Sequence, residues 1–467
     1  MKSIQYIITV ILVSLSLSSC GIYTSYKRPM IVTDGLYRTD RMSDTQIADT
    51  TGNMGNLPWR ELFGDSLLQN HIETGLRQNT DLRIAQLRVD QAQAMLRAAK
   101  LSYLPTLSFA PQGGISGIEG QKSVWTHDEM LAANWEVDIF GKVRNANAAQ
   151  RALLEQSMGY RQAVQSSLVS TIAINYYTLM MLHRQLEVSE QTLTNWSENV
   201  RTLRAMKNAG MTTEAAIAHA EGNYFQVEAS VSEIKQQIFE MENTFSALLG
   251  NMPGQISVNT ASENEGLSAI ISTGVPMQLL SYRPDVRQAE SVLKAAFYNT
   301  NSARASFYPS ITLSGNAGWS NSVGGMIVNP SQFLASAIGS LVQPLFMQGR
   351  LTAQLRVAQA QQEEASLLFQ QTLLDAGVEV NNALSAFQTS KMKSESFANQ
   401  VGALENAVKN TQLLMQHGNN TYLEVLTAQQ ALLAAKLAQI ENDFSESRNL
   451  IVLYRALGGG AYELVEE

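Results

Sequence analysis

Cysteine, proline and positive charge are scarce in this chain of 467 residues, and each shortage excludes something. Cys20 is the only cysteine, so no disulfide can form within the chain. The 33 lysines and arginines are outnumbered by 41 acidic residues, and the net charge of −8 argues against nucleic acid as a partner. Prolines are absent between Pro111 and Pro253 and after Pro344, and such proline-free stretches favour long helices.

Signatures of catalysis and of metal binding are also missing. The five histidines are scattered without the HExxH spacing, and the sequence has no GxSxG, Walker or GxGxxG motif. The 18 methionines include the pair Met180 and Met181, but they form no cluster with histidine that would indicate a copper or silver route. We therefore expect neither an enzyme nor a metal site, and no cofactor other than a covalent lipid.

The N-terminus carries a targeting signal. Lys2 precedes the apolar run "IQYIITVILVSLSL", which is too short for a membrane-spanning helix and ends in "LSSC" at residues 17–20. This pattern resembles a bacterial lipobox and predicts a lipoprotein signal peptide over residues 1–19, with a lipid attached to Cys20. A buried cysteine after an uncleaved anchor is the alternative. Gly21, in place of the aspartate that retains lipoproteins in the inner membrane, favours the outer membrane.

The remaining chain is a tandem repeat. The phrases "SYLPTLSFAP" (102–111) and "SFYPSITLSG" (306–315) are 204 residues apart, and so are "NTDLRIA" and "RPDVRQA". The spacing is 206 at Phe140 and Phe346, and 208 from Gly141 onward. We predict an N-terminal extended segment over 20–64, a first repeat over 65–250, a connector over 251–283 and a second repeat over 284–467. Each repeat would contain a helix, a β-hairpin (about 105–140 and about 309–346) and long helices, and the second would end in a C-terminal tail.

The hairpins are predicted by a period of two. Apolar and polar residues alternate from Leu131 to Ile139 and from Ile311 to Trp319, over about ten residues, a length that crosses a bilayer when the strand is tilted. A soluble hairpin with one buried face is the alternative. Pro111 falls inside the first strand, where we expect it to interrupt the ladder.

The long helices are predicted by a heptad pattern. Its members are Leu179, Leu182, Leu186, Ser189, Leu193, Trp196, Val200 and Leu203. One continuous helix from Gly141 to about Asn208 would be roughly 100 Å long. Gly210 and Gly418 interrupt the pattern in the two repeats, so each repeat is expected to send one helix away from its hairpin and to bring another back.

Counting strands predicts an oligomer. Two hairpins supply four strands, whereas a closed transmembrane barrel needs at least eight. An open sheet edge in lipid would leave backbone groups unpaired, at a cost of several kcal/mol each. Two chains would give eight strands, three would give twelve and four would give sixteen, and the count does not choose among these numbers.

Five motifs resemble the TolC-like outer-membrane factor family, in the family's order and over nearly the whole mature chain. They are "WEVDIFGKVR" (135–144), "RPDVRQAE" (283–290), "QPLFMQGRL" (343–351), "HGNNTYLEVLTAQQ" (417–430) and "ALGGG" (456–460). The lipobox followed by "YKRP" (26–29) is similar to the lipoprotein branch, which serves resistance-nodulation-division pumps. The resemblance implies a mainly α chain with a membrane β-barrel. In a homotrimer, the strands would form a 12-stranded β-barrel continued by a 12-helix periplasmic α-barrel.

The resemblance also implies a function and a location. The protein would be a lipid-anchored exit duct that spans the outer membrane of a Gram-negative bacterium and projects into the periplasm. Its partners would be a periplasmic adaptor protein and an inner-membrane resistance-nodulation-division pump, and its cargo would be small molecules such as drugs or toxic compounds. Two alternatives stay open, namely a type I protein-secretion duct and a lipid-anchored periplasmic coiled-coil scaffold without a pore.

Members of this family close their periplasmic tip with a ring of inward-facing side chains. Carried over to this sequence, the ring consists of Leu423, Glu424 and Thr427, where Thr427 replaces an aspartate that many members have. Glu214 is the acid of the corresponding first-repeat segment, "GMTTEAAIAHA". Three carboxylates in a narrow bore would favour cations, whereas a solvated helix carboxylate is the alternative for Glu424. Opening would require the inner helices to splay near the two glycine breaks.

Overall fold

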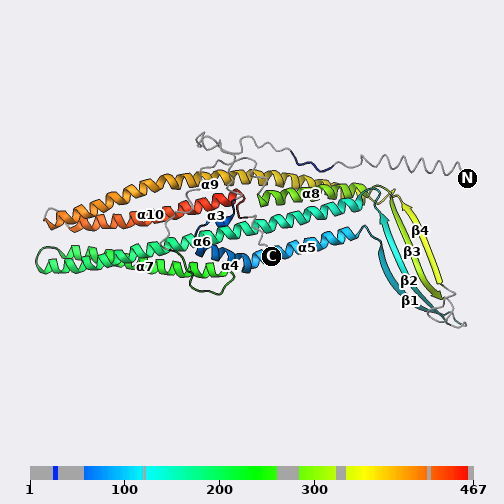
Figure 1. The fold of residues 1–467 in the computed structure, drawn as a ribbon, viewed down its shortest axis with the longest axis horizontal. Coiled ribbons are helices and arrows are strands. Elements are labelled where there is room, and N and C mark those ends of the chain that lie inside the picture. Colours follow the sequence, from blue (N-terminus) through cyan, green and yellow to red (C-terminus); the bar gives the residue numbers. More distant parts are fainter. Residues whose placement is uncertain are drawn as a thin grey trace. The chain divides into compact units, whose positions relative to one another are not determined.

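A computed structural model of the chain describes residues 25–29, 57–117, 119, 123–259, 283–321, 333–417 and 422–460. The predicted signal peptide, Cys20 and Gly418 lie outside these residues. The helices and strands labelled in Figure 1 are α3 (Trp59–Leu62), α4 (Ser66–Gln78), α5 (Thr80–Leu101), β1 (Thr106–Ser116), β2 (Val124–Val137), α6 (Lys142–Asn208), α7 (Glu214–Leu248), α8 (Pro284–Ala305), β3 (Ser310–Asn321), β4 (Phe333–Val342), α9 (Arg350–Gln416) and α10 (Tyr422–Ala456). Both repeats therefore share the order helix, strand, strand, long helix and returning helix. The short helix α3 lies within the segment predicted as extended, 20–64.

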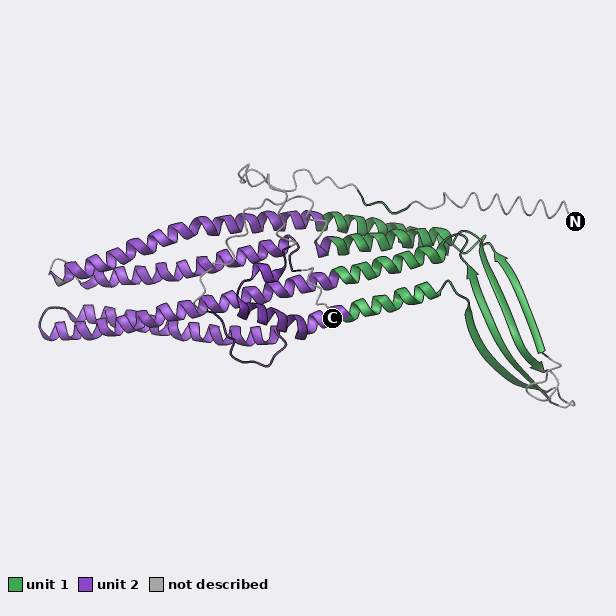
Figure 2. Ribbon diagram, viewed as in Figure 1, with its two compact units in different colours: residues 1–31, 87–159, 287–372 green, residues 32–86, 160–286, 373–467 purple. Residues whose placement is uncertain are grey.

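The chain divides into two compact units, which Figure 2 colours separately. Unit 1 consists of residues 1–31, 87–159 and 287–372, and it holds the four strands and the adjoining parts of α5, α6, α8 and α9. Unit 2 consists of residues 32–86, 160–286 and 373–467, and it holds α3, α4, α7, α10 and the remaining parts of the long helices. The strands thus belong to unit 1 and the predicted ring residues to unit 2.

The four strands form one antiparallel sheet in the order β1-β2-β3-β4. Side chains opposite one another share a face of the sheet, and the register aligns Phe109, Leu131 and Ala317 across three strands. On the other face Asn134 lies opposite Ser314, and their side chains are joined by a hydrogen bond of 2.8 Å. The two faces of β2 and β3 therefore differ in polarity around these residues, as the period of two predicts.

The strand β1 runs through Pro111 without a break. Pro111 lies opposite Glu129 in a register that continues to both ends of β1, so the interruption expected at this proline does not occur. The physical reason is the position of β1 at the edge of the sheet, where a residue without an N–H can turn its nitrogen to the unpaired side.

The helices α6 and α9 each contain 67 residues, or about 100 Å at 1.5 Å per residue. The continuous helix predicted to end near Asn208 is confirmed. Its heptad positions are buried or partly buried, and Leu179, Leu203 and Trp196 are at most 1% exposed. Ser189, the one polar heptad position, is also buried, and its hydroxyl has no hydrogen-bond partner in the described chain. None of the described helices combines the length and the apolar character that crossing a bilayer would need.

Each repeat is closed by a hydrogen bond between the start of the helix that precedes its β-hairpin (α5 or α8) and the end of its returning helix (α7 or α10). In the first repeat, Asn79 Nδ2 donates to the carbonyl oxygen of Leu248 at 2.9 Å. In the second repeat, Arg283 Nη1 donates to the carbonyl oxygen of Ala456 at 2.5 Å. The two donors are 204 residues apart and the two acceptors 208, which are the spacings of the sequence repeat. The repeated phrases therefore mark equivalent contacts in three dimensions.

Candidate functional site

The hairpin of α6 and α7 ends in a tight turn at Gly210. This residue has φ of 74°, a left-handed conformation that favours glycine. The N–H of Met211 donates to the carbonyl oxygen of Met206 at 2.9 Å, as in a Schellman motif, which satisfies the end of α6. Thr213 then caps the first turn of α7 through its side-chain oxygen. The chain thereby reverses within the few residues between Asn208 and the start of α7.

The first two turns of α10 have one buried and one exposed face. Val425 and Leu426 are 2% and 1% exposed. Leu423 is 54% exposed, and Glu424 and Thr427 are exposed as well. Spacings of three and four residues place side chains on the same side of a helix. The structure thus brings the three predicted ring residues together on one surface, which we call the α10 surface.

Leu426 is the contribution of α10 to a buried cluster that we call the tip core. Its members are Trp196, Leu203, Ile217, Ala220, Val227 and Leu426. These side chains come from α6, α7 and α10, so the tip core fixes the start of α10 against the α6–α7 hairpin. Burial of one leucine contributes about 1.5–3 kcal/mol. Tyr422 packs at the edge of the tip core, and its burial raises the pKa of its hydroxyl to about 12.

The charges at the tip differ between the two hairpins. Glu214 forms an ion pair with Lys207, but the two side chains are 71% and 46% exposed, so the pair contributes little to stability. Glu424 has no ion pair or hydrogen bond with any other described side chain. The Thr427 hydroxyl donates to the carbonyl oxygen of Leu423 at 2.9 Å. Glu424 is therefore the source of charge on the α10 surface, and within the described residues no bond joins Glu214 to that surface.

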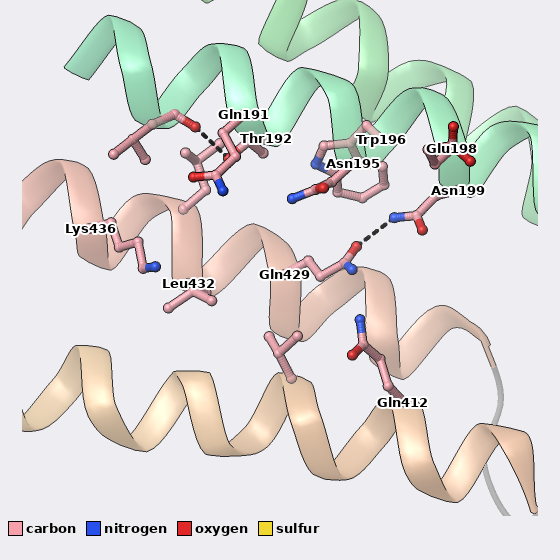
Figure 3. A pocket seen from close by; sticks show the side chains of 13 residues that line it. Gln191, Thr192, Asn195, Trp196, Glu198, Asn199, Gln412, Gln429, Leu432 and Lys436 are labelled. Carbon is pink, nitrogen blue, oxygen red and sulfur yellow. Dashed lines mark hydrogen bonds between the residues drawn. The ribbon is translucent and has the colours of Figure 1, made fainter. Parts of the chain in front are cut away.

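A polar cavity of about 350 Å³ lies between α6, α9 and α10 (Figure 3). Asn199 of α6 donates from Nδ2 to Oε1 of Gln429 of α10 at 2.8 Å, across this cavity. Other amide side chains also line it, namely Gln191, Asn195 and Gln412. A neutral amide bond contributes about 1 kcal/mol and can be exchanged for water, so it ties α10 to α6 reversibly.

The bond between Asn199 and Gln429 has no clear signature in the sequence. The two residues are 230 positions apart, and polar side chains on a long helix usually face water. The only local signal was that Asn199 stands next to the heptad residue Val200. No group of three His, Cys, Asp or Glu side chains suited to a metal ion occurs in the part of the chain that the structure describes.

Comparison with known proteins agrees with the repeated order of helices and strands. The sequence matches the family "Outer membrane efflux protein" over residues 72–251 and 275–459. It is 28% identical to the cation efflux system protein CusC of Escherichia coli O6:H1, covering 96% of this chain and 97% of that protein. It is 27% identical to the probable outer membrane lipoprotein SilC of Salmonella typhimurium, covering 94% of this chain and 95% of that protein.

A crystal structure of CusC has the same fold. It superposes with a TM-score of 0.85 at 26% identity, covering 94% of this chain and all of that chain. The resemblance of the five motifs to outer-membrane factors is thereby confirmed, and so are the mainly α fold with its sheet and the outer-membrane location. A periplasmic scaffold without a pore does not agree with this membership. The chain belongs to the outer membrane efflux protein family and is an efflux channel of the outer membrane.

Proposed function

We propose that the protein is the passive exit duct of a tripartite efflux system and that it works as a homotrimer. The single observation that carries this proposal is the four-stranded sheet, whose outer strands β1 and β4 each pair on one side only within the described residues. A closed transmembrane barrel needs at least eight strands, and three chains would supply twelve. The name of CusC, a cation efflux system protein, speaks for efflux rather than protein secretion.

The duct carries out no chemical step in this proposal. Its energy comes from an inner-membrane resistance-nodulation-division pump, which a periplasmic adaptor protein connects to the helical tip. The cargo consists of small molecules such as drugs or toxic compounds, including cations of the kind for which CusC is named. Selection among these compounds occurs at the pump, because the duct supplies a passage and a gate.

The gate is the α10 surface. In a trimer, the Leu423, Glu424 and Thr427 side chains of three chains surround the aperture, and Glu214 adds an acid from the α7 side. Glu424 lacks an ionic partner in the described chain, so three copies concentrate negative potential in the bore. This arrangement admits cations more readily than anions. The gate opens when the helices before and after Gly210 and Gly418 splay.

The membrane anchor is a lipid on Cys20. Residues 25–29 support this part of the proposal, because they lie against α8 within unit 1. Tyr26 makes an edge contact with the ring of Phe297 at 5.7 Å between centroids, and Arg28 forms an ion pair with Glu290 at 3.5 Å. Four residues lie between Cys20 and Ser25, so five residue-to-residue steps limit the lipid to about 18 Å from that point. The anchor is therefore tied to the strand-bearing unit.

Electrical recording tests the proposal of a pore. The purified full-length protein is reconstituted into planar bilayers, and we expect discrete conductance steps that favour cations. Replacing Glu424→Gln is expected to reduce the preference for cations, while Glu233→Gln, at an exposed position within α7, is the matched control. Bilayers that show no conductance with wild-type protein of verified trimeric mass would contradict a pore.

Cross-linking tests the gate. Because Cys20 is the only natural cysteine, Leu423→Cys introduces the only thiol available for cross-linking once the lipid is attached. A short trifunctional thiol reagent should join the three chains at the tip and stop transport. Met392→Cys, 69% exposed on α9, is the matched control and should leave transport unchanged. Normal transport in fully cross-linked Leu423→Cys protein would contradict a gating role of the α10 surface.

A further inference from the structure

One face of the sheet carries hydrogen bonds between side chains of neighbouring strands. The register pairs even-numbered residues with even-numbered residues in all four strands, so these residues share a face, which we call the even face. Its bonds join Ser320 to Asp128 at 2.5 Å, Thr312 to Ser340 at 2.5 Å, Ser314 to Asn134 at 2.8 Å and Ser336 to Asn316 at 2.9 Å. A barrel that spans a bilayer turns such polar side chains to its interior, because lipid offers them no water.

The opposite face, formed by the odd-numbered residues, has the character of a lipid-facing surface. In β1 and β3 every large apolar side chain lies on this odd face, namely Leu107, Phe109, Ile115, Ile311, Leu313 and Trp319. The ring of Trp319 makes an edge contact with the ring of Phe333 of β4, with 5.5 Å between centroids. Aromatic rings near strand ends are typical of the girdles where a membrane barrel meets water. The odd face is therefore the outer surface of the proposed barrel, and the even face is the inner one.

Asp128 carries a charge on the even face that no cation of the described chain neutralises. Within the described strands this face has two charged residues, Asp128 and Glu136, both from β2. Glu136 Oε1 accepts from Lys142 Nζ at 2.9 Å, so its charge is paired. Asp128 Oδ1 accepts from the neutral hydroxyl of Ser320, and Oδ2 has no hydrogen-bond partner among the described residues. The carboxylate is thus held in place with one oxygen left for water or a passing cation.

Asp128 lies toward the end of the sheet that is farthest from the helices (Figure 1). The strand β2 leads through Val137 into α6, so Glu136 marks the helical end of the strand. Asp128 is eight positions before Glu136, which corresponds to about 27 Å at 3.4 Å per residue. Because the helices are the periplasmic part of an outer-membrane efflux channel, Asp128 lies toward the outer mouth. Ser320, which lies opposite Asp128, follows the girdle residue Trp319 directly.

We propose that Asp128 is a second position that favours cations, at the outer mouth of the duct and in addition to the α10 surface. This inference rests on the proposed trimeric duct and deepens it, because it names cations as the favoured class of cargo at the exit. Twelve strands about 4.8 Å apart and tilted by about 40° enclose a bore of about 12 Å radius. Three Asp128 carboxylates then lie about 10 Å from the axis, close to the screening length of about 8 Å at 0.15 M salt. Their field therefore extends over the bore and weakens as salt is added.

Thiol reaction rates measure this field in the full-length protein in lipid vesicles. Gln112→Cys places a thiol on the even face directly opposite Asp128. A cationic and an anionic methanethiosulfonate reagent of similar size are compared, relative to their rates with a free thiol, and unsubstituted protein gives the background from Cys20. With the thiol and the carboxylate about 6 Å apart, the cationic reagent should be favoured about threefold at 0.15 M ionic strength and about sevenfold at 0.01 M.

Variants of two adjacent residues separate the charge from the fold. Asp128→Asn keeps an oxygen acceptor for Ser320 but should remove the preference for the cationic reagent, whereas Asp128→Glu keeps the charge and should keep the preference. Glu129→Gln removes a charge from the odd face and should leave the preference unchanged. Equal preferences in unsubstituted Asp128 protein and in Asp128→Asn would overturn the proposal. A preference lost in Glu129→Gln and kept in Asp128→Asn would overturn the assignment of the faces.

Two further thiol positions make the test independent of any single variant. Ala110→Cys lies diagonal to Asp128 on the even face, about 7–8 Å away, where the preference at 0.15 M should be about twofold. Phe109→Cys, on the odd face, should react with neither reagent, because lipid covers that face in the vesicle. Reaction of Phe109→Cys without reaction of the two even-face thiols would contradict an inner even face.

Planar bilayers separate this proposal from the proposed function. Wild-type protein that conducts, together with a reagent preference that does not depend on Asp128, would overturn the role of Asp128 and leave the duct intact. Wild-type protein that does not conduct, together with a preference that disappears in Asp128→Asn, would support Asp128 as the source of the field and contradict the duct.

Discussion

Removing the guanidinium of Arg283 should loosen the second repeat at its point of closure. The Arg283 side chain is 8% exposed, and it donates to Asp285 at 2.8 Å, to Glu379 at 2.6 Å and to the carbonyl oxygen of Ala456 at 2.5 Å. Burial alone would lower the pKa of Arg283, but the two carboxylates outweigh burial and the pKa is raised. The guanidinium is therefore a buried cation that the fold stabilises.

The expected loss of stability in Arg283→Met depends on which interactions Asp285 and Glu379 retain. Methionine preserves the apolar stem of the side chain, so the loss is confined to the charged head. Breaking a buried ion pair costs about 3–5 kcal/mol when the remaining charge is stranded. Here Glu379 keeps Arg455 at 3.0 Å, and Asp285 is 43% exposed, so neither carboxylate is stranded. We expect the lower end of the range, about 3 kcal/mol.

The first repeat provides the matched control. Asn79→Ala removes a neutral hydrogen bond to the carbonyl oxygen of Leu248 and the helix cap that accepts from the N–H of Leu82. Together these losses should lower the free energy of unfolding by about 2 kcal/mol. Hydrogen exchange of backbone amides reports each closure separately. Amides in the second turn of α8 should exchange about 100-fold faster in Arg283→Met, and those in the second turn of α5 about 30-fold faster in Asn79→Ala. Equal exchange of α8 in wild type and Arg283→Met would refute this account of the second closure.

Three further predictions concern the helical hairpins. Gly210→Ala should destabilise the tip by about 1 kcal/mol, because residue 210 has a left-handed φ that alanine adopts only with strain. Gly222→Ala should stabilise it by about 0.5–1 kcal/mol, because residue 222 lies inside α7 with open space for a Cβ atom. Thermal unfolding measures both effects. Asn199→Ala should raise the open probability in bilayers about fivefold by removing the bond to α10, and Asn195→Ala, in the same cavity, should not. Burial, and after it the nearby Glu446, raises the pKa of the Asp443 carboxyl in the folded state. The folded state therefore loses stability as the pH rises from 3.8, the ordinary pKa of aspartate, through the raised value. Asp443→Asn should unfold at a higher temperature than wild type at about pH 7 but not at about pH 3.

The parts of the fold that the sequence predicts are those with a local period. The heptad seam can be predicted from a short stretch of sequence, because Trp196 and Leu203 are seven residues apart, an interval that puts side chains on one helix face. The pairing of β2 with β3 has no such signal. Asn134 and Ser314 are 180 residues apart, and alternation within a strand shows which face is buried but not which strand lies beside it. Pro111 illustrates the same limit, since its effect depends on whether β1 lies at an edge.

The candidate site divides in the same way. The residues Leu423, Glu424 and Thr427 come from a resemblance between motifs, and the structure adds that they share one exposed face of α10. Their role in an aperture stays a prediction. The bond between Asn199 and Gln429 exists only because the tip core brings α6 and α10 together, so neither residue differs locally from any solvated amide on a long helix.

The tip core also limits how the proposed gate can open. The same turns of α10 expose Glu424 and bury Leu426. A rotation of α10 that moved Glu424 would therefore expose Leu426. Exposing Leu426 costs about 1.5–3 kcal/mol, and losing the bond to Asn199 adds about 1 kcal/mol. In a trimer these costs amount to roughly 7–12 kcal/mol, more than the thermal energy supplies at rest. A shift of α10 along α6 that breaks the bond to Asn199 but keeps Leu426 in the tip core avoids the larger cost, so opening by displacement of packed helices is less costly than twisting α10 alone.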